Sequence, residues 1–342
     1  MQTLMVGLLV VLAFAPAHAV TLRVANNGQN VAGCGQAGAT PCRSITRAIA
    51  NASDGDTILV GPGKYGDLNG SGVLGGVGEE IGNVDGCNCV VNVNKRVRLR
   101  STAGADATTI DGRGLGLVGV AVSADEAVFG AKGKGFSVLG GGVGIGGNQA
   151  TVEGNVIDGG FDSVSVGGFD DVVRGNRIVN AVAVGVFLGG LRTQLLGNVI
   201  THNNEAIEIQ YEPESSDSSH SIRGNYIVGN DSGLTMNGYN DVVTGNAILG
   251  NAGLGVTIDG SGSFCRNNIY GNDEALTEAP CLVGTGFRNT GTSVSARDNF
   301  WGAAGGPGPN PADQVCDDGG TTTVVPFAAS ERPVTTKQIT CP

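Results

Sequence analysis

Two carboxylates, Glu208 and Asp259, fall on one side of a repeated alternating pattern and have the chemistry of a general acid and base. Glu208 lies in Ile207–Ile209, and Asp259 directly follows Val256–Ile258, two repeats further along the chain. If each repeat adds one strand to a sheet, two strand spacings separate them by about 9.6 Å. An inverting glycosidase holds its acid and base roughly 6.5–9.5 Å apart. The pair is therefore a candidate for hydrolysis of a glycosidic bond.

Polar and aromatic residues occupy the neighbouring outward positions and would line a ligand groove beside this pair. An aromatic ring there can stack on a sugar, and amide and hydroxyl groups can bond the sugar hydroxyls. The outward side of a solvated strand is polar in any case, so an ordinary sheet surface is the competing interpretation. The preceding repeats carry small residues at these positions and look featureless. The candidate groove residues are Phe187, Gln210, Thr235, Asn237 and Thr257.

A second candidate site is the one repeat that is longer than its neighbours, because its extra residues must loop out beside the groove. Clustered carboxylates on a loop can bind Ca²⁺ through oxygen, and a histidine among them can act as an acid or base. The segment is also rich in serine, and a solvated acidic loop is the interpretation that we favour. The candidate residues are Glu205, Glu212, Glu214, Asp217 and His220.

The element that positions these residues is a repeat of the form Gly-Asn-x-Ile. Its asparagines stand at positions 155, 176, 198, 225 and 246, at spacings of 21, 22, 27 and 21 residues, and weaker copies follow at 267 and 299. A fixed period of this length is typical of a solenoid, whose coils bury their apolar faces only against neighbouring coils. The spacing predicts an all-β, single-stranded right-handed parallel β-helix, with three short strands and three bends in each coil.

The Gly-Asn pair has a local physical role. The bend needs a positive φ, which glycine adopts freely and asparagine tolerates better than most residues. Asparagines stacked one coil apart can hydrogen-bond as a ladder along the axis, and the isoleucines would fill the core beneath. The Leu-x-x-Leu-x-Leu pattern of leucine-rich repeats is missing, and aromatic residues make up only 5% of the chain, which suits a narrow core.

The ends of the chain predict a leader and two caps. An apolar run before Ala17-His18-Ala19 is typical of a cleaved signal peptide, residues 1–19. Residues 20–342 then form one domain, with an N-terminal cap over about 20–65, coils over about 66–301 and a tail over about 302–342. Within the cap, Thr40 and Pro41 favour the start of a short α-helix whose apolar face contains Ile45, Ala48 and Ile49.

Eight cysteines in an exported chain indicate disulfides rather than a metal site. Zinc would need paired Cys-x-x-Cys or histidine partners, and only two histidines remain after cleavage of the leader. Proximity along the sequence predicts the pairs Cys34–Cys42, Cys87–Cys89, Cys265–Cys281 and Cys316–Cys341.

The formal charge of −11 counts against several partners. Nucleic acids and anionic membranes are bound through Lys and Arg, so neither is expected. An acidic surface also does not steer polyanionic sugars towards it. No second apolar segment reaches membrane length, so we expect no membrane insertion. The chain is expected to be a secreted, extracellular or periplasmic monomer.

The two ends resemble a known group of proteins. The Pro41-Cys42-x-x-Ile45 helix, the following Gly55–Tyr65 segment and the closing Asn299–Gly302 segment are similar to those of the pectin-lyase-like right-handed β-helix superfamily. The resemblance implies the fold across nearly the whole mature chain. It implies little about activity, because the superfamily includes lyases, hydrolases, esterases, epimerases and members of no known activity.

The enzyme motifs of the superfamily are largely missing. Of the sequence motifs that a polygalacturonase-like enzyme would show, only the paired aspartates Asp170-Asp171 occur, and they lie within a bend. A pectate-lyase-like enzyme would need an arginine base among the outward polar residues around Glu208 and Asp259, and no arginine lies there. We therefore expect a non-catalytic module that binds a polysaccharide or cell-surface glycan, or serves in adhesion. The alternative is a carbohydrate-active hydrolase or lyase that uses Glu208 and Asp259. No cofactor is expected, with Ca²⁺ at the long repeat as the one candidate.

Overall fold

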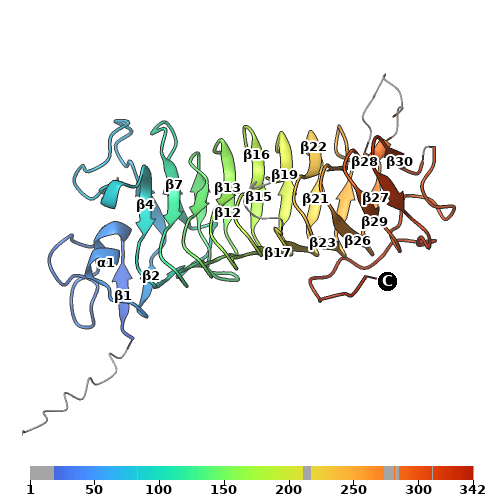
Figure 1. The fold of residues 1–342 in the computed structure, drawn as a ribbon. Helices are drawn as coiled ribbons and strands as arrows, with labels where there is room; N and C mark the ends of the chain where they lie inside the picture. The colour runs from blue at the N-terminus through green and yellow to red at the C-terminus, as the bar shows by residue number, and fades with distance from the viewer. Residues whose placement is uncertain are drawn as a thin grey trace, which may run out of the picture.

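The computed structural model describes residues 19–82, 84–210, 217–272, 281, 285–309 and 311–341. Three parallel sheets wind around one axis, so that each coil adds one strand to each sheet (Figure 1). Parallel crossovers of this kind are right-handed in nearly all proteins. The predicted all-β, right-handed parallel β-helix is confirmed. The predicted leader, residues 1–19, lies outside the described residues except for its last position.

Glu208 lies on the outer face of a sheet that has ten strands within the described residues. Its register aligns Ser165 with Phe187, Phe187 with Glu208, and Glu208 with Thr235, as the alternation predicts. Its strands are β4 (Cys89–Val93), β7 (Val118–Val122), β10 (Val143–Ile145), β13 (Asp162–Val166), β16 (Val184–Leu188), β19 (Glu205–Ile209), β22 (Ser232–Met236), β25 (Val256–Ile258), β28 (Thr285–Asn289) and β30 (Gln314–Asp317).

The other two sheets complete the coils. In the part of the chain that the structure describes, the twelve-stranded sheet contains β1 (Thr21–Val24), β2 (Thr57–Val60), β5 (Arg98–Ser101), β8 (Val128–Gly130), β11 (Thr151–Glu153), β14 (Val172–Arg174), β17 (Gln194–Leu196), β20 (Ser221–Arg223), β23 (Asp241–Thr244), β26 (Gly262–Cys265), β29 (Ser293–Ser295) and β31 (Thr321–Thr323). The nine-stranded sheet contains β3 (Gly63–Gly66), β6 (Thr108–Asp111), β9 (Ser137–Leu139), β12 (Val156–Asp158), β15 (Arg177–Val179), β18 (Val199–Thr201), β21 (Tyr226–Val228), β24 (Ala247–Leu249) and β27 (Asn268–Tyr270).

The core is a set of aliphatic columns that run along the axis. The isoleucines of the repeat are fully buried, because each side chain is covered by the equivalent side chains of the coils before and after it. Larger rings fill other parts of the core: Phe129 stacks on Phe136, and Phe287 packs edge-on against Phe264 and Trp301. The isoleucine column comprises Ile157, Ile178, Ile200, Ile227, Ile248 and Ile269.

The asparagines of the repeat form the predicted ladder. The backbone N–H and Nδ2 of Asn176 donate to Oδ1 of Asn198 at 2.9 and 3.0 Å, and Nδ2 also donates to the Val152 carbonyl at 3.0 Å. The glycines before these asparagines have positive φ, 60° at Gly175 and 61° at Gly197. A buried amide would be costly without such partners. The same bonds are made by Asn155, Asn198, Asn225, Asn246 and Asn267.

A second ladder follows the next bend of the coil. Asn203 donates from its backbone N–H and from Nδ2 to Oδ1 of Asn230, and Asn230 makes the same pair of bonds to Asn251. The series continues to Asn272, whose Nδ2 donates to Asp313. Two of the three bends are therefore fixed by buried amides, which holds the strands between them in register.

The N-terminal end is covered by α1 (Ile45–Asn51), whose apolar face is buried as predicted. The predicted N-cap is wrong: the helix begins after Ser44, whose hydroxyl accepts a hydrogen bond from the Arg47 N–H, and not after Thr40. Thr40 is used elsewhere, because its carbonyl accepts a hydrogen bond from Gly35. A 3₁₀ turn, η1 (Val84–Gly86), leads into β4.

The C-terminal tail returns along the Gly-Asn corner of the coils (Figure 1). The Arg332 N–H and carbonyl both bond the Asn268 side chain, at 2.7 and 2.9 Å, and the Thr335 N–H donates to the Gly245 carbonyl at 3.1 Å. A Cβ atom on Gly224 would lie 2.6 Å from the Thr335 carbonyl carbon. The corner glycines are therefore needed for close contact with the tail as well as for positive φ.

The path of the tail explains why two of the four predicted disulfides are wrong. Cys34–Cys42 and Cys87–Cys89 are confirmed, whereas the predicted pairs Cys265–Cys281 and Cys316–Cys341 are wrong. The structure pairs Cys265 with Cys341 and Cys281 with Cys316, across 76 and 35 residues. The tail carries position 341 back to the coil of Cys265, so closeness along the sequence did not indicate closeness in space.

Candidate functional site

The outer face of the ten-stranded sheet is hollowed where β7, β10 and β13 lie next to one another. The hollow has a volume of about 440 Å³. It exists because the outward residue of β10 is Gly144, where an added Cβ would meet only a Val118 methyl at 3.8 Å. The lining residues are Asn88, Gly116, Leu117, Val118, Gly140, Gly141, Val143, Gly144, Gly160, Phe161, Asp162 and Ser165.

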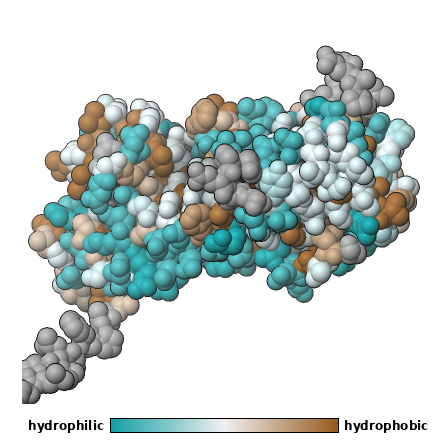
Figure 2. Space-filling model, in the orientation of Figure 1, coloured by the Kyte–Doolittle hydropathy of each residue, from teal (hydrophilic) through white to brown (hydrophobic). Residues whose placement is uncertain are grey.

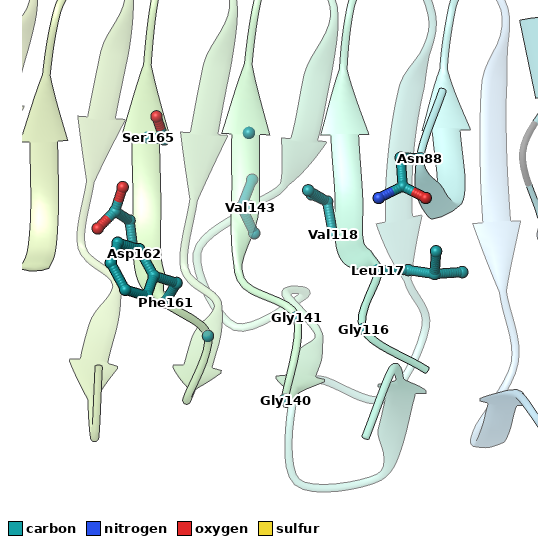
Figure 3. Close-up of a pocket in the computed structure, with 12 residues that line it drawn as sticks. Asn88, Gly116, Leu117, Val118, Gly140, Gly141, Val143, Phe161, Asp162 and Ser165 are labelled. Carbon is teal, nitrogen blue, oxygen red and sulfur yellow. The ribbon is translucent and has the colours of Figure 1, made fainter. Parts of the chain in front are cut away.

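The walls of the hollow differ in chemistry. Phe161 and Asp162 lie together on one side, and Val118, Leu117 and Asn88 lie on the other (Figure 3). Phe161 is 74% exposed, so its ring is free to contact a ligand. It stands at the bend before β13, after two glycines with positive φ that turn the chain outwards. The hollow thus offers a flat apolar ring and a carboxylate on one wall and an amide on the opposite wall.

Three carboxylates, which we call the acidic wall, continue from the hollow across neighbouring coils: Asp162, Glu205 and Glu208. Burial raises the pKa of all three. The Asp162 carboxylate further raises the pKa of Glu208, and Glu208 further raises that of Glu205. A hydrogen bond from the Thr235 hydroxyl opposes the rise at Glu205. The acidic wall is therefore a group of mutually repelling charges.

The predicted pair Glu208 and Asp259 has separate surroundings. Glu208 interacts with Asp162 and Glu205 of the acidic wall. Asp259 is exposed beyond the end of β25, where its carboxylate meets the Thr290 hydroxyl at 3.5 Å. The structure therefore groups Glu208 with residues on the N-terminal side of it, and the assignment of Glu208 and Asp259 as a catalytic pair stays a prediction.

The predicted groove residues form a continuous column only in part. Phe187, Thr235 and Thr257 align with Glu208 in register, whereas Gln210 and Asn237 follow the ends of their strands. Beyond Thr257 the column continues to Arg288, which is paired with Asp318. From the N-terminal end the column reads Asn92, Ala121, Gly144, Ser165, Phe187, Glu208, Thr235, Thr257 and Arg288.

The long repeat does not form one site. Glu205 belongs to β19 and the acidic wall, Asp217 bonds the Ser219 hydroxyl, and Glu212 and Glu214 lie outside the described residues. The interpretation of His220 as a loop residue is wrong, because it is 1% exposed and its Nδ1 accepts the Thr193 N–H at 3.1 Å. Burial lowers the pKa of His220 to about 4. The regular path of the coil has therefore resumed before position 220.

Sequence reasoning missed Asn88, Phe161 and Asp162. The available signal was the pair of small residues at successive outward positions, Ala121 and Gly144, which leave a depression next to an aromatic and an acidic residue. These positions looked featureless because small residues carry no chemistry themselves.

Figure 2 shows hydrophobic residues scattered among hydrophilic ones on the face in view, most densely towards the N-terminal end, where Val73 and Val77 are exposed. Across the described ranges, no group of three or more His, Cys, Asp or Glu side chains is placed to hold a metal ion. Among the helices that the structure describes, none is long and apolar enough to cross a membrane.

Three parallel sheets in 21–22-residue coils, with a hollow on the outer face of one sheet, define a protein of the right-handed parallel β-helix class. A family model described as "Periplasmic copper-binding protein (NosD)" matches residues 50–302, and the chain belongs to this family. The expected location, secreted or periplasmic, is confirmed.

Solved structures with a similar fold include three enzymes. A pectate lyase, Pel9A, has 14% identity over 91% of this chain and 80% of its own, with a TM-score of 0.48. A rhamnogalacturonan lyase has 11% identity, coverage of 92% and 90%, and a TM-score of 0.45. The A-module of an Azotobacter vinelandii mannuronan C-5 epimerase has 14% identity, coverage of 82% and 90%, and a TM-score of 0.41. No curated protein sequence matches significantly.

Proposed function

We propose that this secreted or periplasmic β-helix protein binds a polysaccharide or cell-surface glycan in the hollow over β7, β10 and β13, without cleaving it. The observation that carries the proposal is a cavity of about 440 Å³ that is lined by the exposed Phe161 ring and by the polar side chains of Asn88, Asp162 and Ser165. A sugar presents an apolar face and a rim of hydroxyls, which such a set complements. The parallel strands supply a rigid platform, so little ordering is needed on binding.

The absence of cleavage is supported by the different surroundings of Glu208 and Asp259. A glycosidase needs both carboxylates at the same glycosidic bond. Here Glu208 is grouped with the acidic wall, on the side that faces away from Asp259. One observation favours the alternative, a carbohydrate-active hydrolase or lyase. Burial and Asp162 raise the pKa of Glu208, which is the shift that a general acid needs.

Copper binding, which the family description names, does not suit the residues of this chain. Copper is bound by thiolate, thioether or imidazole groups. All eight cysteines form disulfides. Among the described residues, Met236 is buried in the core, the Nδ1 of His220 accepts a backbone N–H, and His202 lies next to Thr201 at 2.9 Å. We therefore propose no copper site, and Ca²⁺ at the long repeat stays a prediction.

The test is a glycan array with the purified protein, followed by titration of the glycans that bind. Phe161→Ala should weaken binding about tenfold through loss of ring stacking. Phe169→Ala is the matched control, because Phe169 is 44% exposed and packs near Arg192 outside the hollow. Equal loss in both variants, or binding to no glycan, would contradict the proposal.

The same preparation separates the two functions. Each bound glycan is incubated with the protein and assayed for new reducing or unsaturated ends. Binding without product supports the non-catalytic module. Product that is lost in Glu208→Gln supports the enzyme.

A further inference from the structure

We propose that the hollow is selective for uncharged glycans and that the acidic wall excludes polyuronates from it. This inference rests on the proposed function and adds the class of ligand. It concerns three side chains: Asp162, which lines the hollow, and Glu205 and Glu208, which stand on the coils beyond it.

The position of the acidic wall brings it against a bound chain. Asp162 is aligned through Val184 with Glu205, so the two residues lie two coils apart, about 10 Å. Glu208 is aligned through Phe187 with Ser165, which also lines the hollow. A glycan long enough to leave the hollow towards β19 therefore passes all three carboxylates.

Cationic groups that would offset this charge are missing from the column. From Asn92 to Thr257 its residues are uncharged except for Glu208, and the first basic residue is Arg288. Arg288 lies five coils beyond Ser165, roughly 24 Å away, which is more than two Debye lengths at physiological salt. It is also neutralised by Asp318. Arg113 lies beside Gly140, which lines the hollow, but it is paired with Asp111. An approaching uronate would thus meet no unpaired cation among these residues.

The carboxylates of the acidic wall already repel one another before any ligand binds. Glu208 feels the charge of Asp162, and Glu205 feels the charge of Glu208. One oxygen of Glu205, Oε1, is buried without a hydrogen-bond partner. A further carboxylate at about 4–6 Å adds repulsion worth roughly tenfold or more in affinity in this partly desolvated setting. Hydroxyl groups, in contrast, can donate to these oxygens.

The experiment uses ligand pairs that differ only in charge. The pairs are polygalacturonate with its carboxyl-reduced polymer, and a glucan oligosaccharide with its C6-oxidised form, titrated against the full chain in EDTA. We expect the uncharged member of a pair to bind at least tenfold more tightly. The double variant Glu205→Gln/Glu208→Gln should narrow this difference to about threefold by strengthening uronate binding, which a misfolded protein would not do.

The control is Asp106→Asn/Glu126→Gln, which removes two charges from exposed residues elsewhere and should leave the preference unchanged. Uronates that bind as tightly as their uncharged partners would overturn the selectivity while leaving the proposed function intact. Tight uronate binding that appears only with added Ca²⁺ would also overturn the selectivity, because Ca²⁺ would then bridge the uronate to the acidic wall and the wall would not exclude it. Failure of all four ligands and of the wider array would refute the proposed function itself.

Discussion

The backbone N–H of His220 donates to Oδ1 of Asp241 at 2.7 Å, so that two buried titratable side chains follow each other along one column of the solenoid. Burial lowers the pKa of His220 to about 4 and raises that of Asp241 to about 7. The two groups therefore respond to pH in opposite directions. Oδ2 of Asp241 and Nε2 of His220 have no hydrogen-bond partner, which is consistent with both being uncharged when folded.

Asp241 should make the fold less stable as pH rises. Its folded pKa of about 7 exceeds the ordinary 3.8, so its contribution is complete below pH 3.8 and is lost as pH rises through 7. The difference corresponds to roughly 4 kcal/mol at most. Urea unfolding of Asp241→Asn should therefore lack the loss seen in the wild type between about pH 4 and pH 7. The exposed Asp231→Asn is the control, and identical pH curves for wild type and Asp241→Asn would contradict the assignment.

His220 should make the fold less stable as pH falls. Its folded pKa of about 4 lies below the ordinary 6.5, so its contribution is complete above pH 6.5 and declines as pH falls towards 4. The expected loss is roughly 3 kcal/mol. In His220→Asn a side-chain oxygen can still accept the Thr193 N–H, and the acid loss should shrink. A variant at the exposed His202 should leave that loss unchanged, and any equal effect there would speak against burial as the cause.

The asparagine ladder should carry a large share of local stability. Asn198→Ala removes an Oδ1 that accepts two hydrogen bonds from Asn176 and an Nδ2 that donates to Val173 and Asn225. Buried partners left unpaired cost about 1–3 kcal/mol each, so we expect a loss of about 2–4 kcal/mol in thermal or urea unfolding. Asn204→Ala, at an exposed position outside the ladder, should change stability by less than about 0.5 kcal/mol. Similar losses in both variants would show that the ladder adds little.

The tail disulfide should matter more than the one in the N-terminal cap. Cys265–Cys341 closes 76 residues and Cys34–Cys42 closes 8, so loop entropy gives about 4.5 and about 2.5 kcal/mol respectively. Paired Cys→Ser variants of each bridge should rank in that order by melting temperature. Hydrogen exchange at the Thr335 amide should rise only when the tail bridge is removed, because its hydrogen bond to the Gly245 carbonyl is then released. The reverse ranking would indicate that the tail holds itself in place without the bridge.

The fold was predictable because its signal repeats. Asn176 and Asn198 perform the same task one coil apart, and the alternation around Phe187 and Glu208 correctly gave their register. The disulfide of Cys265 was not predictable, since it depends on the path of a tail that has no repeat. The lengthened coil suggested that His220 was a loop residue. Its hydrogen bond to Asp241, one period later in the sequence, shows that it instead lies in the regular coil.

The hollow was missed for a different reason. A depression is made by what Gly144 lacks, and sequence reasoning weighted only residues that carry functional groups. The neighbours of an empty position become informative only when the register between β10 and β13 is known.

The ladder also makes the length of the protein an editable quantity. Asn225 and Asn246 have equivalent partners in successive coils, so residues 226–246 constitute one interchangeable unit of 21 residues. Excision of this unit would let Asn225 bond the Asn267 side chain that Asn246 now uses, and duplication would add one more rung. Each such edit shortens or extends the outer face by about 4.8 Å, while the hollow and both caps keep their residues. Insertion or deletion of a whole coil would thus change how many sugar units the proposed glycan-binding face spans and would leave the hollow itself unaltered.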